Sequence, residues 1–272
     1  MLPPNSYFVC TTPRSGSTLL CETLARTGLA GRPNEWFEAL RATDTRRQPR
    51  QYFDEIPPDI EELLPIVTEE PQPELARAGT YLDYLDWVAT EGTTPNGVFG
   101  AKIMWGHVHD LAGRLRELRS ADAQTDVAVF RDAFPRARFV RIVRTQKIEQ
   151  AVSLWKAIQT QHWRAGANQE RTRREPVYHE WAIATLARQL FDHERRWTEF
   201  FDQLGAEPLT ISYDDIVGDL RGTVVAVLEH LGVAVPEALE VRPLLRRQAD
   251  ERSQEWVRRF VADNRAGHAA AA

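Results

Sequence analysis

Short β-prone segments alternate along this chain with segments of helical periodicity. The β-prone segments are residues 7–11, 98–104, 138–143 and 209–213. Apolar residues recur at helical spacing in residues 18–27, 77–90, 111–118, 147–155 and 222–231. Strands that alternate with helices are typical of a parallel sheet covered on both faces. The sequence therefore predicts an α/β fold in three layers, with a central parallel β-sheet flanked by helices.

The chain shows no internal repeat and no clear domain boundary, which predicts a single domain over residues 1–272. A chain of this length can bury a substantial core without disulfide bonds. The polar, proline-containing residues from about 41 to 75 are expected to form short helices and loops that cover the core. Residues 264–272 are expected to form a frayed tail.

The composition excludes several classes of protein. A formal net charge of −5 argues against a nucleic-acid-binding protein, although a locally basic pocket can still bind a nucleotide. The two cysteines, Cys10 and Cys21, are too few for a disulfide framework or a metal cluster, so no metal is expected. No apolar run reaches the ~18 residues that span a bilayer. The first residues lack the pattern of a signal peptide, so a cytoplasmic protein is expected.

Residues 13–20, PRSGSTLL, carry the strongest local signal for chemistry. A predicted strand leads into a tight turn, where Gly16 lets the backbone approach a ligand closely. The N–H groups that begin the next helix, with its partial positive charge, suit a phosphate or sulfate group. The side chains of Arg14, Ser15, Ser17 and Thr18 add further donors. The alternative is an ordinary capped helix start, because serine and threonine are common N-caps.

This loop differs from the phosphate loop of nucleoside triphosphatases. That loop reads G-x-x-x-x-G-K-[ST], whereas residues 13–20 form a shorter loop with no lysine after the glycine. Magnesium-dependent chemistry on a nucleoside triphosphate is therefore disfavoured, and a P-loop small-molecule kinase is kept as an alternative function.

Residues 14–20, RSGSTLL, resemble the 5′-phosphosulfate loop of sulfotransferases that use 3′-phosphoadenosine-5′-phosphosulfate (PAPS). Arginine stands here where that family usually has lysine. The resemblance implies that this part of the donor is held by Arg14, Ser15, Gly16, Ser17, Thr18 and Leu19.

Residues 134–144, FPRARFVRIVR, look like a second segment of that family. In the family, the arginine that closes this strand and a serine in the next helix hold the 3′-phosphate of the donor. Arg144 and Ser153 match those positions, although Ser153 follows one residue later than is usual and the aspartate common in that turn is missing. Residues 212–216, SYDDI, are similar to a third segment.

Four longer segments extend the resemblance over nearly the whole chain: GRPNEWFEAL, TPNGVFGAKIMW, AVSLWKAIQT and RRQADERSQEWV. All resemble the bacterial, mycobacterial-type trehalose 2-sulfotransferase family. The resemblance implies a P-loop sulfotransferase-like (nucleotide-kinase-like) fold and a homodimer active in sulfolipid biosynthesis. It also implies transfer of a sulfuryl group from PAPS to trehalose, with release of adenosine 3′,5′-bisphosphate (PAP). The alternatives are another sugar or glycosylated metabolite as acceptor, and a catalytically silent relative that binds PAP.

A sugar hydroxyl is a poor nucleophile, so a general base is expected. The resemblance implies that Glu35, in the segment PNEWF, is this base. The alternative is a solvated loop carboxylate, which is the usual fate of glutamate. His107 is a competing base, because His107 and His109 follow a predicted strand and ligands bind beyond the strand ends in open α/β folds.

Four further residues are candidates for the acceptor site. Trp36, Phe37 and Trp105 would provide apolar walls for a sugar ring, and the alternative for each is core packing. Lys102 lies within a predicted strand, where a lysine is costly to bury unless it is paired. Its expected partner is either the sulfuryl group or a carboxylate.

Near the C-terminus, residues 246–253 form a segment of mixed charge. The family resemblance places Arg247, Gln248 and Arg252 against the adenosine and 3′-phosphate of the donor. The alternative is a solvated charged face, which explains most such segments.

Overall fold

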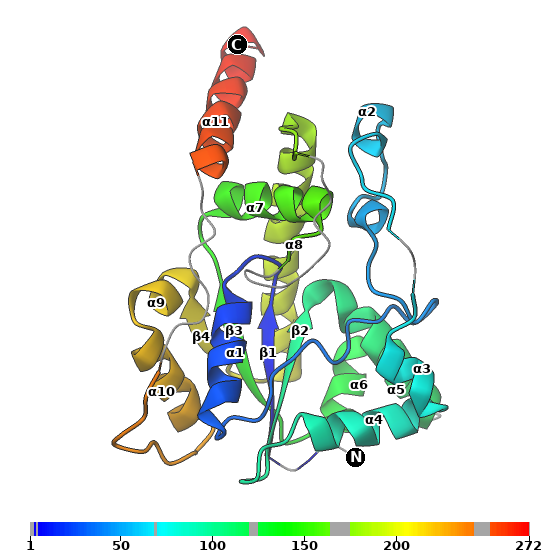
Figure 1. Ribbon diagram of the computed structural model, residues 1–272, viewed down its shortest axis with the longest axis vertical. Coiled ribbons are helices and arrows are strands. Elements are labelled where there is room, and N and C mark those ends of the chain that lie inside the picture. Colours follow the sequence, from blue (N-terminus) through cyan, green and yellow to red (C-terminus); the bar gives the residue numbers. More distant parts are fainter. Residues whose placement is uncertain are drawn as a thin grey trace. The chain divides into compact units, whose positions relative to one another are not determined.

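The computed structural model describes residues 3, 5–67, 70–119, 125–163, 175–241 and 251–271 (Figure 1). The chain divides into two compact units. The first is formed from residues 1–47, 69–144 and 193–244, and the second from residues 48–68, 145–192 and 245–272. The single domain inferred from the sequence stays a prediction.

A parallel sheet forms the centre of the first unit (Figure 1). Over the described residues it has four strands in the order β2-β1-β3-β4, and every neighbouring pair is parallel. The strands are β1 (Asn5–Thr11), β2 (Val98–Met104), β3 (Arg138–Val143) and β4 (Leu209–Ser212). All four predicted strands are therefore confirmed, with boundaries within two residues of those expected.

The strand register aligns the carboxyl ends of the strands at one edge of the sheet. Thr11 of β1 pairs with Met104 of β2, and Val143 of β3 pairs with Ser212 of β4. Ligands of open α/β sheets bind beyond this edge. The loop from residue 12 to residue 16, the residues after Met104 and the residue Arg144 all begin there.

Helices cover both faces of the sheet. Successive side chains of a strand point to opposite faces, and the apolar side chains of β1 therefore pack against helices on each side. On one face, Tyr7 and Val9 of β1 pack with α1 (Ser17–Thr27), α9 (Tyr213–Gly218) and α10 (Leu220–His230). On the other face, Phe8 and Cys10 pack with α4 (Tyr81–Glu91), α5 (Val108–Arg119), α6 (Asp126–Ala133) and the later part of α8 (Glu180–Leu204). This arrangement confirms the predicted three-layer α/β fold.

The second unit has its own apolar core among the described residues. It contains η1 (Pro49–Tyr52), α2 (Pro58–Glu61), α7 (Lys147–Thr160), the first half of α8 and α11 (Glu251–Ala271). Trp155 of α7 is fully buried there and belongs to the same core as Leu186 and Trp256.

Several helices differ from those expected. The helix predicted over residues 77–90 is two helices, α3 (Pro73–Ala78) and α4, because Gly79 adopts a φ of 77° and Thr80 caps a new helix through Asp83 N. Residues 41–75 contain η1, α2 and the start of α3. Residues 264–271 continue α11 as helix, whereas a frayed tail was expected. α6, α8, α9 and η2 (Trp105–His107) were not predicted.

Candidate active site

The loop between β1 and α1 has the geometry of an anion-binding turn. Gly16 is the residue before α1, with a φ of 85°, and no side chain caps the helix. The capped start that serine or threonine would provide is therefore absent from α1. The first N–H groups of the helix are left available for a ligand, as in phosphate-binding turns. Arg14 also adopts a positive φ, of 60°, which turns the chain sharply before Gly16.

The end of β1 is anchored below this loop. The hydroxyls of Ser15 and Thr11 lie 2.6 Å apart, and both side chains are fully buried. The indole Nε1 of Trp197 donates to the backbone oxygen of Thr11 over 3.0 Å. Ser15 thus holds the loop onto the strand that precedes it, and its role as a donor to a ligand stays a prediction.

Arg144 reaches the same loop from the end of β3. Its Nη1 donates to the backbone oxygen of Arg14 over 3.0 Å. Its guanidinium carbon lies 4.3 Å from the centre of the Tyr213 ring. The structure therefore brings the Arg144 guanidinium to the backbone of the loop at Arg14, at the carboxyl edge of β1 and β3.

Glu35 lies beside β2 and forms an ion pair with Lys102. A parallel bridge joins Asn34 to Ala101, and the N–H of Lys102 donates to Asn34 O over 2.8 Å. This pairing aligns Glu35 with Lys102, whose Nζ lies 2.7 Å from Glu35 Oε1. The Lys102 side chain is 2% exposed and that of Glu35 is 22% exposed. Of the two partners expected for Lys102, the structure shows the carboxylate.

Lys102 also connects Glu35 to the start of α1. Its Nζ lies 3.3 Å from Oγ1 of Thr18, in the first turn of α1. The carboxylate of Glu35, the ammonium of Lys102 and the start of α1 therefore form one cluster at the sheet edge.

The predicted aromatic residues mostly contact the protein core. The Nε1 of Trp36 donates to Gly100 O over 3.0 Å, and its ring packs edge-on against Trp87. Phe37 is 4% exposed and belongs to the apolar core of the first unit. Trp105 packs edge-on against Trp197, with ring centres 5.0 Å apart. Core packing thus describes these contacts, and contact with an acceptor stays a prediction.

The two histidines after β2 lie in different surroundings. Nδ1 of His107 is buried without a hydrogen-bond partner. The pKa of His107 is lowered to about 4, mainly by burial and also by the nearby Arg47, while Glu35 and Asp110 oppose the shift. His109 is exposed, and its Nδ1 lies 3.0 Å from Asp126 Oδ2. Of the two, His107 is electrostatically coupled to Glu35.

Comparison with known proteins decides the family of this chain. The model of the family described as Stf0 sulphotransferase matches residues 6–263. The chain belongs to the Stf0 sulphotransferase family. It is therefore a sulfotransferase.

Two curated relatives of this sulfotransferase cover nearly all of it. The trehalose 2-sulfotransferase of Mycobacterium tuberculosis is 38% identical over 258 residues, 94% of each chain. The trehalose 2-sulfotransferase of Mycolicibacterium smegmatis is 37% identical over 263 residues, 96% of each chain. Among solved structures, a sulfotransferase from Alicyclobacillus acidocaldarius is 15% identical, with a TM-score of 0.46 over 97% of this chain and 93% of the other. Because that likeness is distant, the family assignment rests on the family model and the two relatives.

Of the four remaining predicted donor residues of this sulfotransferase, the structure describes Ser153 and Arg252. Ser153 lies on α7, in the second unit. Arg252 is the second residue of α11 and forms an ion pair with Glu175 over 2.5 Å. Arg247 and Gln248 lie outside the described residues. The donor contacts of these four residues stay predictions.

Two residues beside the site were not predicted from the sequence. Trp197 of α8 holds the end of β1, and Tyr213 lies against both Gly16 and Arg144. Tyr213 belongs to the segment that resembles the sulfotransferase family, which was a signal for its place at the end of β4. Trp197 lies in none of the segments that resemble the family.

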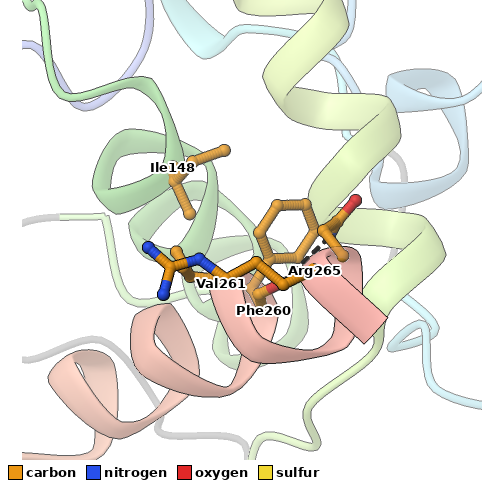
Figure 2. A pocket seen from close by; sticks show the side chains of 5 residues that line it. Ile148, Phe260, Val261 and Arg265 are labelled. Carbon is orange, nitrogen blue, oxygen red and sulfur yellow. Dashed lines mark hydrogen bonds between the residues drawn. The ribbon is translucent and has the colours of Figure 1, made fainter. Parts of the chain in front are cut away.

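The second unit contains an apolar pocket (Figure 2). It has a volume of about 470 Å³ and is lined by Ile148, Phe260, Val261, Asn264 and Arg265. None of the predicted site residues lines this pocket. In the part of the chain that the structure describes, no helix is long and apolar enough to cross a membrane. Over the same residues, no cluster of three or more His, Cys, Asp or Glu side chains has the arrangement of a metal site.

Proposed function

We propose that this sulfotransferase transfers a sulfuryl group from PAPS to the 2-hydroxyl of trehalose, with Glu35 as the general base. One observation carries the proposal. Lys102 holds the Glu35 carboxylate 2.7 Å away while its Nζ lies 3.3 Å from Thr18 at the start of α1. A proton acceptor is therefore next to the turn that suits the anionic end of the donor.

The loop residues fit such a donor. A Cβ at Gly16 would collide with the Tyr213 ring, and no side chain caps the helix start. The uncapped helix start leaves backbone N–H groups open to an anion. Arg14 and Arg144 add charge beside the loop, and Arg144 would hold the 3′-phosphate.

The reaction is an in-line displacement at sulfur. The acceptor oxygen forms a bond to sulfur, the bond from sulfur to the 5′-phosphate oxygen breaks, and PAP leaves with that electron pair. Glu35 accepts the proton of the attacking hydroxyl. The loop N–H groups and Arg14 would stabilise the negative charge on the leaving phosphate, and Lys102 would contact the sulfuryl oxygens. By analogy with phosphoryl transfer, positioning and charge stabilisation supply most of the catalysis.

The acceptor is supported by the relatives. Both are trehalose 2-sulfotransferases, and their alignments with this chain extend over at least 94% of each chain. The test is an acceptor screen with PAPS and trehalose, glucose and other disaccharides, read by mass spectrometry as an added sulfate. Sulfation of trehalose is expected. Sulfation of another sugar alone would overturn the assigned acceptor, and phosphate transfer from ATP would overturn the donor.

The role of Glu35 is tested by Glu35→Gln. We expect this variant to keep its affinity for PAP and to lose about 10²- to 10⁴-fold in turnover, the range for loss of a general base. Glu38→Gln is the matched control, because Glu38 lies on the same segment and pairs with Arg46 over 2.6 Å. Unchanged turnover in Glu35→Gln would remove Glu35 from this role.

The family resemblance also supports a homodimer that works in the cytoplasm. Light scattering of the purified protein should then give about twice the 31.1 kDa mass of one chain. A mass of one chain at micromolar concentration would contradict the dimer.

A further inference from the structure

Tyr213 lies against both the Gly16 loop and Arg144, which bind the donor in the proposed function. It is the first residue of α9 and directly follows the last residue of β4. A capping box fixes the direction of this helix start. Ser212 Oγ accepts from Asp215 N over 3.0 Å, and Asp215 Oδ2 accepts from Ser212 N over 2.8 Å. The ring of Tyr213 is therefore carried by a well-defined turn.

One edge of this ring packs against the anion-binding loop. A Cβ built on Gly16 would lie 2.8 Å from Cδ2 and 3.3 Å from Cε2 of Tyr213. Carbon atoms in ordinary contact are about 3.5–4.0 Å apart, so only a glycine fits between the loop and the ring. Tyr213 thus limits how far the loop can move toward β4.

The same ring carries the guanidinium of Arg144. The guanidinium carbon is 4.3 Å from the ring centre, which is within the range of a cation–π interaction. Nη1 of Arg144 also donates to Arg14 O in the loop. The guanidinium lies over the face of the ring. Its N–H groups point outward from its edge, in the geometry that suits phosphate oxygens.

We infer that Tyr213 is a positioning residue for the donor: its ring sets the separation between the Gly16 loop and the Arg144 guanidinium. These two groups bind separate anions, so a fixed separation favours a ligand with two phosphate groups at a defined distance. The inference rests on the proposed function, in which the loop takes the 5′-phosphate end and Arg144 takes the 3′-phosphate.

The test is a double-mutant cycle on PAP binding, measured by calorimetry. Tyr213→Leu removes the ring face, and we expect PAP to bind about tenfold more weakly, the size of a partly desolvated cation–π contact. Tyr213→Phe keeps the ring and should stay within about threefold of the unaltered protein. Because Tyr213 acts through Arg144, adding Tyr213→Leu to Arg144→Ala should weaken binding by less than about threefold.

The outcomes separate this inference from the proposed function. If the unaltered protein has no affinity for PAP, the proposed function fails and this inference fails with it. If PAP binds but the two substitutions weaken it independently, or if Tyr213→Phe is as damaging as Tyr213→Leu, only the positioning role is overturned. Thermal unfolding of each variant checks folding, and Tyr213→Met replaces Tyr213→Leu in the cycle if the leucine variant does not fold.

Discussion

The ammonium of Lys102 lies 2.7 Å from the carboxylate of Glu35, and the two partners differ in burial. Lys102 is 2% exposed, whereas Glu35 is 22% exposed and so retains contact with water. A charge that loses its partner is costly in proportion to how completely it is removed from water. The two halves of this ion pair therefore contribute unequally to stability.

We predict that Glu35→Gln lowers the free energy of unfolding more than Lys102→Met does. The first substitution leaves a buried ammonium without its counter-charge and should cost about 3 kcal/mol, whereas the second leaves a partly solvated carboxylate and should cost roughly 1 kcal/mol. Urea unfolding of both variants and of the double variant measures the difference. Equal losses would show that burial does not control the energetics of this pair.

We predict that Gly16→Ala and Gly28→Ala separate ligand binding from stability. Both glycines flank α1 with positive φ, 85° and 67°, but a Cβ meets the Tyr213 ring only at Gly16. Each alanine should cost about 1 kcal/mol or more for the left-handed backbone. Only Gly16→Ala should also weaken PAP binding, by about tenfold or more.

Calorimetric titration with PAP and thermal unfolding of both glycine variants provide the two readouts. Equal loss of PAP affinity in Gly28→Ala would mean that strain in α1, and not the Gly16 contact, governs binding.

We predict that His107 destabilises the folded protein in mild acid. Its pKa is lowered from 6.5 to about 4 by burial, so the unfolded chain binds the proton first as the pH falls. The free energy of unfolding should therefore decrease between about pH 6.5 and pH 4, by at most about 3 kcal/mol from this residue. The measurement is urea unfolding over that pH range for the unaltered protein and for His107→Gln.

His109→Gln is the control for the His107 experiment, because His109 is exposed and contacts Asp126. The acid-induced loss should be smaller in His107→Gln and nearly unchanged in His109→Gln. The same acid dependence in the unaltered protein and His107→Gln would rule out this residue as its source.

We predict that the cap of α9 supports ligand binding as well as stability. Ser212→Ala removes the hydroxyl that accepts from Asp215 N, and Thr80→Ala removes the equivalent cap of α4. Each should lower the free energy of unfolding by about 1 kcal/mol. Only Ser212→Ala should also weaken PAP binding, because Tyr213 directly follows that cap. If Thr80→Ala weakens PAP binding as much, the link between the α9 cap and the site is wrong.

Local patterns were sufficient for the sheet and for most of the helices that cover it. Each strand is a short apolar run, and the spacing of Leu20 and Leu24 marks the buried face of α1. The spacing signal of α8 was also present, since Leu186, Leu190 and Trp197 are all buried on one helix. That helix was missed although its signal is local. The break at Gly79 was missed because helical spacing continues through residues on both sides of it.

The sequence by itself determined the α/β fold and the place of the glycine turn before α1, because apolar periodicity and glycine stereochemistry act over a few neighbouring residues. The family likeness added Glu35 and Arg144 as candidates. Only the tertiary structure decided that Lys102 pairs with Glu35 and that Tyr213 lies against Gly16 and Arg144. These contacts join residues far apart in the chain, and the parallel register of the sheet brings them to one edge. No local pattern encodes that register, because it depends on how all four strands and their covering helices pack.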